Sequence, residues 1–254
     1  WGLRAVPIPV DDGGVQTAEL AASGVAAALL TPAHQFPTGV VLSPARRRAL
    51  LEWAAAGGVV IEDDYDAEHR YDRAPVPALH ASSPDHVAHT GSTSKTLAPG
   101  LRLGWLIPPP HLAAELVAAK HASDLGSPAV PQLALAHLLA SGEYERQLRL
   151  VRVRHRRRRD AMLAALRTHL PQARIEGVAA GLHLLVTLPG TPGHADDTAV
   201  AAAAGRAGIV VHPLSWHRRL AGPPGLVLGY AAYPPDRLQD AVRRLAAVVT
   251  GSGG

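Results

Sequence analysis

Two apolar segments joined by one helix constrain the fold of this chain most strongly. VAAALLTP (25–32) is typical of a short buried strand, and VVIEDDY (59–65) is typical of a second strand. Between them, Ser43-Pro44 predicts a helix start with Ser43 as N-cap, and Gly57-Gly58 predicts the helix end. Strand, helix and strand in that order imply parallel pairing through a right-handed crossover. The sequence therefore predicts an α/β fold built on a mostly parallel sheet.

The rest of the chain predicts a large part and a smaller part. HVAHTG (86–91) and RLGWLIP (102–108) are typical of two further strands, and the pattern turns helical from about residue 110. After Pro171, strands and helices alternate again. We therefore expect three regions: a large domain over 1–150, a smaller C-terminal α/β domain over 151–250 that includes a connecting helix, and a flexible tail over 251–254.

Composition limits the classes of function. Of the 254 residues, 47% are hydrophobic and 18% are charged, which is typical of a folded globular chain and not of a disordered one. No apolar run approaches the roughly 20 residues that span a bilayer, so no membrane partner is expected. The chain has no cysteine, which excludes disulfides and thiol catalysis and favours a reducing, cytoplasmic setting. None of the 14 histidines forms a typical metal spacing with a carboxylate, so we expect no metal site.

The arginine run RVRHRRRRD (152–160) carries much of the basic charge. Four consecutive arginines spread around the circumference of a helix and cannot form a basic stripe on one face. We interpret the run as a solvated connecting helix, with a DNA-binding element as the alternative.

Lysine is rare in this chain. The 25 basic residues include only two lysines, Lys95 and Lys120. The segment GSTSKTLAPGLRLGW surrounds Lys95 with small hydroxylated residues. An amine can form an imine with an aldehyde, whereas a guanidinium stays protonated, so a lysine is required where that chemistry occurs. A surface lysine in a loop of small residues is the alternative.

Side chains at two neighbouring strand ends suit pyridoxal 5′-phosphate (PLP). Strand alternation puts Asp63 and Tyr65 on one face at the carboxyl end of the predicted strand, where parallel sheets collect ligands. In a PLP site, a lysine forms a Schiff base, an acid pairs with the pyridine nitrogen, and a donor holds the phenolic oxygen. Lys95, Asp63 and Tyr65 supply these groups, and the phosphate would find hydroxyl, backbone and guanidinium donors at Ser92, Ser94 and Arg102. An Asp-Asp pair that caps a helix or turn is the alternative for the acids.

Four segments carry a resemblance to a known family: TPAHQFPTG (31–39), VIEDDYDAEHRY (60–71), GSTSKTLAPGLRLGW (91–105) and AGLHLL (180–185). In order and spacing they resemble fold-type I PLP-dependent aminotransferases of class I/II. They are most similar to the aminotransferase-like C-terminal domain of MocR-type, GntR-family transcriptional regulators. The resemblance covers nearly the whole chain. It implies the following site: Lys95 as the internal aldimine, Asp63 on the pyridine nitrogen, Tyr65 on the ring oxygen, and Ser92, Ser94 and Arg102 on the phosphate.

The resemblance also implies partners. It predicts a homodimer and a small amine or amino-acid effector or substrate. DNA would be bound only through a helix-turn-helix domain on the N-terminal side, which this chain does not contain. Because Trp1 would fall within the family's large domain, we expect an N-terminally truncated, incomplete large domain.

One departure from the family lies in HQFPTG. Ordinary aminotransferases carry an asparagine immediately before the proline, where it contacts the ring oxygen, and here that residue is Phe36. An apolar ring cannot donate this hydrogen bond, so Tyr65 would carry it alone. His34 and Gln35 are nearby polar candidates, with a structural role as the alternative for each.

A second departure concerns the substrate. Many relatives place an arginine for the substrate carboxylate at the start of the last strand, where this chain has Val227. Arg218 or Arg219 could substitute, although surface charge is the simpler interpretation of both. Three functions stay open. The first is an effector sensor in a regulator, which the departures favour, and the second is an active aminotransferase. The third is a lysine Schiff-base lyase without cofactor, against which the phosphate-suited serines and Arg102 argue.

Overall fold

The computed structural model of the chain describes residues 2–66, 68–71, 76–188 and 196–251. Most of the predicted flexible tail, residues 252–254, lies outside the described residues. The chain divides into two compact units, and each is described here by itself. Unit 1 comprises Trp1–Gln35, Val40–Glu68 and Ala74–Val151, and unit 2 comprises Phe36–Gly39, His69–Arg73 and Arg152–Gly254.

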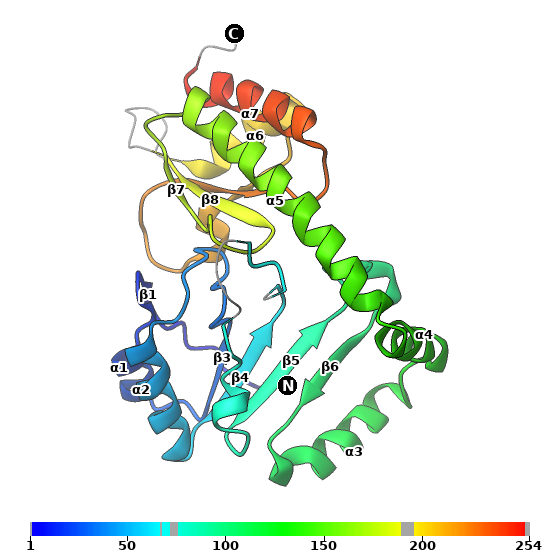
Figure 1. Ribbon diagram of the computed structural model, residues 1–254. Helices are drawn as coiled ribbons and strands as arrows, with labels where there is room; N and C mark the ends of the chain where they lie inside the picture. The colour runs from blue at the N-terminus through cyan, green and yellow to red at the C-terminus, as the bar shows by residue number, and fades with distance from the viewer. Residues whose placement is uncertain (1, 67, 72–75, 189–195, 252–254) are drawn as a thin grey trace. The chain divides into compact units, whose positions relative to one another are not determined.

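A four-stranded sheet forms the centre of unit 1. Its strands lie in chain order: β3 (Ala27–Leu30), β4 (Val59–Asp64), β5 (Val87–Ser92) and β6 (Gly104–Ile107) (Figure 1). The β3–β4 and β4–β5 pairs are parallel, whereas β6 pairs antiparallel with β5. The predicted α/β fold with a mostly parallel sheet is therefore confirmed, and β6 is the one reversed strand in the described part of this sheet.

The helix between β3 and β4 begins where the sequence predicts. In α2 (Pro44–Ala55), the Ser43 side chain accepts a hydrogen bond from the backbone N–H of Arg46, and Pro44 occupies the first turn. Leu50 of α2 is fully buried with Val60 of β4 and Val87 of β5 in the core of unit 1. Burying each such side chain contributes about 1.5–3 kcal/mol. The remaining elements before β6 are short: β1 (Val10–Asp11), β2 (Gly14–Val15), α1 (Thr17–Ala22), η1 (His80–Ser82) and η2 (Pro99–Leu101).

The last helices of unit 1 are unusually open. After η3 (Pro110–Leu112), neither α3 (Ala113–Asp124) nor α4 (Ala129–Ala140) contains a buried residue. All four residues of β6 are also exposed. We call the large hydrophobic side chains that are exposed on these three elements the apolar surface of unit 1: Trp105, Leu106, Ile107, Leu116, Val117, Val130, Leu133 and Leu139.

Unit 2 is built on an antiparallel sheet in the order β7-β8-β10-β9. Its strands are β7 (Arg174–Glu176), β8 (His183–Thr187), β9 (His212–Pro213) and β10 (Gly225–Gly229). Its core joins Leu184, Leu226 and Tyr230 to Leu166 and Leu245 of the helices. The helical elements are α5 (Glu143–His169), whose first residues belong to unit 1, α6 (Asp197–Arg206), η4 (Leu214–His217) and α7 (Pro235–Val249).

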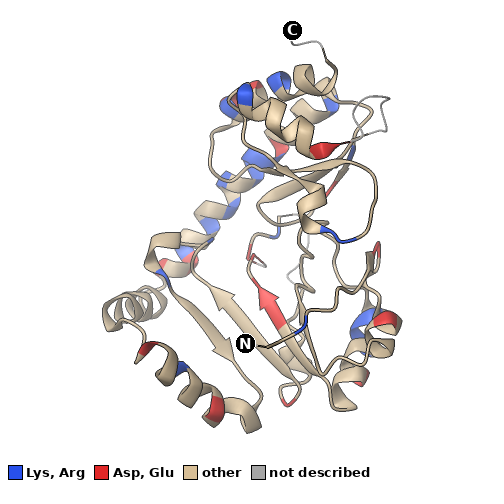
Figure 2. Cartoon of the chain, turned by 180° about the vertical axis from the view of Figure 1, so that it is seen from behind, with Lys and Arg blue, Asp and Glu red and all other residues tan. Residues whose placement is uncertain are grey.

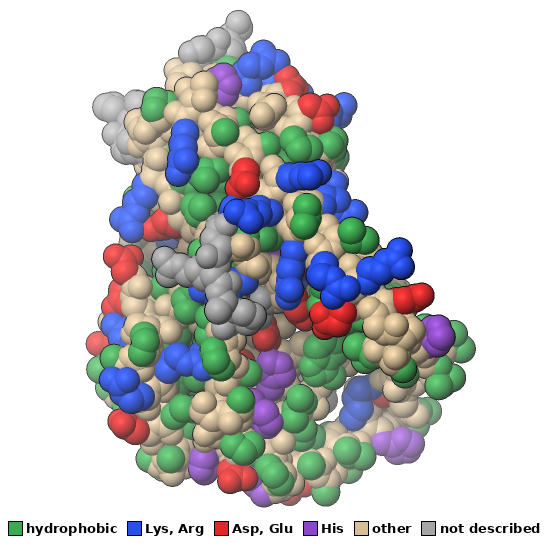
Figure 3. Space-filling model, viewed as in Figure 1, with side chains coloured by type: hydrophobic (Ala, Val, Ile, Leu, Met, Phe, Trp, Pro, Cys, Tyr) green, Lys and Arg blue, Asp and Glu red, His purple; other side chains and the backbone are tan. Residues whose placement is uncertain are grey.

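The arginine run lies on α5 and is only partly solvated. Arg154, Arg156 and Arg157 are exposed, and on the face seen in Figure 3 the Lys and Arg side chains are interspersed with acidic and hydrophobic ones. Arg159 differs, because it is 4% exposed, its guanidinium lies 5.0 Å from the centre of the Tyr71 ring, and it donates to the Val178 carbonyl. The interpretation of the whole run as solvated is therefore wrong for Arg159, which helical periodicity places on the buried face of α5.

Among the helices that the structure describes, none combines the length and the apolar character that crossing a membrane requires.

Candidate functional site

The predicted site residues of unit 1 share one edge of its sheet. Because β4 and β5 are parallel, with Asp63 opposite Thr90, their carboxyl ends meet at that edge. Figure 2 shows the acidic residues at this end of β4. The antiparallel β6 begins at the same edge, since Gly104 lies opposite Ser92. The backbone thus brings together the six predicted residues: Asp63 in β4, Tyr65 just after it, Ser92 at the end of β5, Ser94 and Lys95 in the following loop, and Arg102 just before β6.

The loop that carries Lys95 is held by two buried threonines. Thr93 donates from its backbone N–H to the Leu103 carbonyl at 3.0 Å, and its carbonyl accepts from the Thr96 hydroxyl at 3.4 Å. Thr93 and Thr96 are 0% and 2% exposed, whereas Lys95 is exposed. The buried threonines therefore form the support, and the lysine lies on the accessible side. The sequence analysis did not predict that the threonines are buried while the lysine is exposed. The alternation of serine and threonine in GSTSKT is the signal that could have indicated it.

The serines beside the lysine keep donors available. Ser92 and Ser94 are half-buried, and the Ser92 hydroxyl accepts from the Ser94 backbone N–H at 3.3 Å. Since that bond uses the Ser92 oxygen as acceptor, the hydroxyl proton can be donated to an anion.

The carboxylate of Asp63 can accept a further hydrogen bond. One oxygen accepts from the Thr90 hydroxyl at 3.3 Å, and no other partner of the side chain lies among the described residues. The group is half-buried, where an acid with few hydrogen bonds is costly. Its second oxygen can accept from a protonated ring nitrogen, which fits the donor set of a PLP site.

Tyr65 is a protonated hydrogen-bond donor. Burial raises its pKa well above the ordinary range, and the charge of Asp66 adds to the effect. The hydroxyl donates to the backbone carbonyl of His34 at 3.2 Å. A neutral phenol fits the role of a donor to the ring oxygen of PLP.

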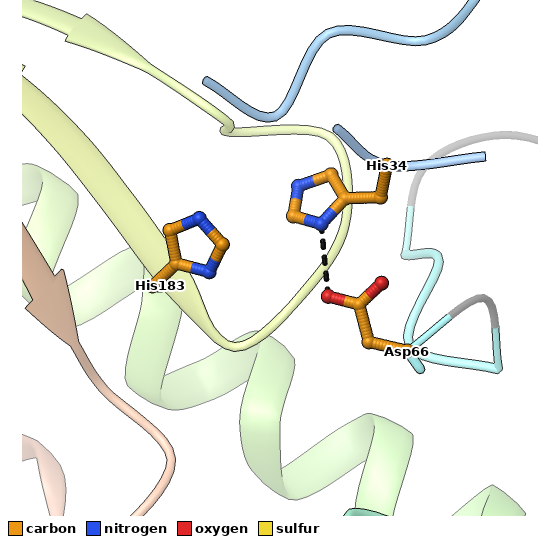
Figure 4. Close-up of side chains that lie close together, drawn as sticks. All are labelled: His34, Asp66 and His183. Atoms are coloured by element: carbon orange, nitrogen blue, oxygen red, sulfur yellow. Dashed lines mark hydrogen bonds and ion pairs between the residues drawn. The ribbon is translucent and has the colours of Figure 1, made fainter. Parts of the chain in front are cut away.

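His34 and Asp66 form a buried pair beside Tyr65. The His34 Nδ1 atom lies 2.8 Å from an Asp66 carboxylate oxygen, and the two side chains are 1% and 2% exposed (Figure 4). His34 was only a polar candidate in the sequence, and Asp66 was missed. Its signal is the third acid of EDDYD, which directly follows Tyr65.

Arg102 has a strained backbone. Its φ of +52° lies in the left-handed region, which L-residues with a side chain rarely adopt. Such a conformation costs about 1–3 kcal/mol and concentrates at ligand sites. The side chain is exposed at the same edge as Lys95, so a guanidinium is available there for a phosphate.

Two departures from the family lie in unit 2. The Phe36 ring packs edge-on against the rings of His183 and His217, with centroid distances of 5.1 and 5.0 Å. Val227 is buried in β10, between β8 and β9. Arg218 donates to the carbonyls of Gly222 and Pro223 in its own loop, at 2.6 and 2.7 Å, so its guanidinium is already occupied.

Comparison with known proteins decides the family. Residues 17–247 match the family model described as Aminotransferase class I and II. The chain belongs to this family. It is 34% identical to the HTH-type pyridoxine biosynthesis transcriptional regulator PdxR of Corynebacterium glutamicum over 98% of the chain and 54% of that protein. It is 29% identical to the probable rhizopine catabolism regulatory protein MocR of Rhizobium meliloti, over 96% of the chain and 50% of that protein. The chain therefore spans about half the length of these regulators.

Solved structures of class I and II aminotransferases share the fold. Kynurenine aminotransferase of Pyrococcus horikoshii, solved in complex with PMP and KYN, superposes with a TM-score of 0.86 at 28% identity. The superposition covers 98% of this chain and 64% of that one. The predicted resemblance to PLP-dependent aminotransferases and to MocR-type regulators is therefore confirmed.

Proposed function

We propose that this chain is a PLP-binding aminotransferase-like domain and that it is the effector-sensing part of a MocR-type transcriptional regulator. The observation that carries the proposal is the gathering of Lys95, Asp63, Tyr65 and Arg102 at one sheet edge of unit 1. The similarity to the regulators PdxR and MocR supports the sensing role.

Each residue has one task in this proposal. PLP supplies, when bound, an aldehyde for amines and a ring that accepts electrons. The Lys95 amine attaches the cofactor, and Asp63 keeps a proton on the ring nitrogen. Tyr65 donates its hydroxyl proton to the ring oxygen, since its raised pKa keeps that proton on the phenol. The phosphate is bound by the donors of Ser92, Ser94 and Arg102.

The residues of unit 2 that the sequence offers for a substrate carboxylate favour sensing over turnover. Arg218 is committed to its own loop, and Val227 offers no charge. Arg219, the other candidate, is exposed, so none of these three positions holds a buried, fixed guanidinium. A substrate carboxylate without a bidentate anchor is oriented less productively. We therefore infer that a small amine or amino acid binds as an effector that the domain senses, and not as a substrate that is turned over.

The two lysines give a matched test. The chain is incubated with PLP, reduced with borohydride and mapped by peptide mass spectrometry. We expect a pyridoxyl group on Lys95 in the parent protein and in Lys120→Ala, which alters an exposed lysine of α3. Lys95→Ala should lose the visible absorption and the label. Equal labelling of Lys120, or full absorption in Lys95→Ala, would overturn the proposal.

An active aminotransferase is the second candidate. The similarity to a kynurenine aminotransferase solved with its substrates favours it. The PLP-loaded protein is mixed with an amino donor and a keto acid, and product is counted per site. Many turnovers would establish the enzyme, whereas at most one amino group per site is expected of the sensor.

We further propose that the chain pairs with a second copy and that DNA is bound by another domain of the longer protein. The apolar surface of unit 1 supports pairing, because many large hydrophobic side chains exposed on consecutive elements are typical of an interaction site. Leu133 of α4, which is 69% exposed, is the residue to change. Sedimentation should show a dimer that Leu133→Glu dissociates, while Leu3→Glu, in a residue outside this surface that is 92% exposed, should leave the dimer intact. A monomeric parent protein at micromolar concentration would contradict pairing.

A further inference from the structure

A buried histidine–aspartate pair lies against the hydroxyl of Tyr65 in unit 1. The side chains of His34 and Asp66 are 1% and 2% exposed, and Nδ1 of His34 lies 2.8 Å from Asp66 Oδ2. The same Nδ1 lies 3.2 Å from the Tyr65 hydroxyl oxygen. None of the roles in the proposed function uses His34 or Asp66.

The hydrogen-bond directions follow from the chemistry of these groups. The short contact to a carboxylate places a proton on His34 Nδ1, because the carboxylate can only accept. That nitrogen is then a donor and cannot accept from Tyr65. Without the cofactor, the tyrosine proton is directed to the His34 backbone carbonyl at 3.2 Å, and it can turn from there toward a PLP ring oxygen. The phenolic oxygen is thereby held between the carbonyl and the Nδ1–H group of the same residue.

A purely structural role would not need two buried polar side chains. An ion pair taken out of water contributes little net stability, and apolar side chains of similar volume often replace one at no cost. The pair instead contacts the phenol of Tyr65, so its geometry bears on where that hydroxyl points.

We propose that Asp66 and His34 are positioning residues for Tyr65: Asp66 fixes the His34 ring, and His34 fixes the phenolic oxygen for donation to a PLP ring oxygen. The proposal rests on the proposed function of Tyr65. Asp66 acts on Tyr65 through His34 and also through its own contact with the phenol, and neither residue contacts the reacting atoms.

The first test needs no cofactor. The protein is labelled with 13Cζ-tyrosine, and the Tyr65 signal is assigned with Tyr65→Phe. Asp66→Leu, which removes the acceptor, should move this signal toward that of a solvent-exposed tyrosine. Asp66→Asn keeps an acceptor oxygen for His34 and should restore the parent signal. An unchanged signal in a folded Asp66→Leu protein overturns the proposal.

The second test uses the PLP-loaded protein and the pH midpoint of its visible absorption. Losing a donor to the ring oxygen makes the bound chromophore harder to deprotonate, so Tyr65→Phe should raise the midpoint by about one pH unit. Asp66→Leu should raise it in the same direction, Asp66→Asn should restore it, and Asp66→Leu/Tyr65→Phe should match Tyr65→Phe alone. Asp64→Leu, which removes the adjacent acid, controls for lost charge and should shift the midpoint less.

The two tests separate the possible failures. A parent protein that takes up no PLP at Lys95 refutes the proposed function, while the cofactor-free spectrum still decides whether the pair holds Tyr65. Midpoint shifts of Asp66→Leu and Tyr65→Phe that add in the double variant show independent action and overturn the positioning role.

Discussion

Glu62 of β4 accepts a hydrogen bond from His89 of β5 at 3.1 Å across the parallel sheet of unit 1. The carboxylate is 2% exposed and also accepts the backbone N–H groups of Leu79 and His80, at 2.8 and 3.2 Å. One buried acid thus joins two strands to the turn that contains η1. Such an arrangement is stable only while its charges are paired.

The Glu62–His89 pair should stabilise the protein most within a limited pH range. Burial raises the pKa of Glu62, but hydrogen bonds from His89 and two backbone groups outweigh it and lower the pKa. The bond to Glu62 raises the pKa of His89. Stability from His89 is therefore full below its ordinary pKa of 6.5 and is lost at higher pH, while stability from Glu62 is full above 4.5 and is lost at lower pH. The contribution is greatest between pH 4.5 and 6.5.

His89→Gln tests this window. Because His89 is partly exposed, we expect a loss of about 1 kcal/mol of unfolding free energy near pH 5.5, shrinking toward pH 8.5. Urea unfolding at both pH values measures it. His111→Gln, in an exposed residue of η3, should show no such pH dependence. A loss that is equal at both pH values would contradict the ion pair.

Gly91 is required by the tryptophan opposite it. A Cβ atom at residue 91 would lie 2.4 Å from Trp105 Cζ2, so the two cross-strand partners cannot both be large. Gly91→Ala should cost about 1–3 kcal/mol and shift the fluorescence of Trp105 as the ring moves. Gly91→Ala in a Trp105→Ala background should cost clearly less. An equal cost in both backgrounds would mean that backbone strain, not the ring, is responsible.

The sequence anticipated the fold better than it anticipated the supports of the site. Apolar strands, an N-cap and a proline are local signals, and they predicted α2 and the parallel β3–β4 pair. The antiparallel direction of β6 depends on how the loop 93–103 closes, which periodicity does not encode. The burial of Arg159 likewise depends on Tyr71, which is 88 residues away in the chain.

The residues of the candidate site also fall into a group that the sequence predicts and a group that only the structure reveals. Residues that contact the cofactor in this proposal, such as Lys95 and Asp63, stand out because their chemistry is unusual in their segment. Residues that hold others in place, such as Asp66 and Thr93, have no signature of their own, since many acids and threonines look alike in a sequence. Their roles emerge only from tertiary contacts.

Tyr144 connects the start of α5 to the loop of Lys95. Its hydroxyl donates to Thr96 Oγ1 at 3.2 Å, and both groups are buried. Tyr144→Phe should lower the unfolding free energy by about 0.5–1.5 kcal/mol and weaken PLP uptake, because the loop loses one support. Thermal unfolding and PLP titration measure the two effects. Tyr233→Phe, in a tyrosine that is 59% exposed, is the matched control and should change neither. PLP uptake equal to that of the parent protein would show that the loop is held without this bond.

Asp197 is the buried acid of unit 2. Its carboxylate accepts the backbone N–H groups of Ser215 and Gly225, both at 3.1 Å, and it is 2% exposed. Asp197→Ala should destabilise the protein by about 2–4 kcal/mol, because the buried N–H of Gly225 and the half-buried N–H and hydroxyl of Ser215 lose their acceptor. The neighbouring Asp196→Ala removes only an exposed N-cap of α6 and should cost about 1 kcal/mol. Comparable losses in the two variants, measured by urea unfolding, would contradict the assignment.

His155 of α5 should weaken unit 2 in acid. Burial lowers its pKa to about 4, and the neighbouring His69 and Arg154 add like charge. Its ring lies 5.1 Å from that of His69, and its Nδ1 has no hydrogen-bond partner among the described residues. The unfolded chain binds a proton below pH 6.5 while the folded ring stays neutral, so stability falls from pH 6.5 to 4. His155→Gln, which cannot be protonated, should flatten that decline in urea unfolding, whereas His137→Gln in exposed α4 should not. If the unfolding free energy of His155→Gln declined in acid as much as that of the parent protein, another residue would be responsible for the acid sensitivity.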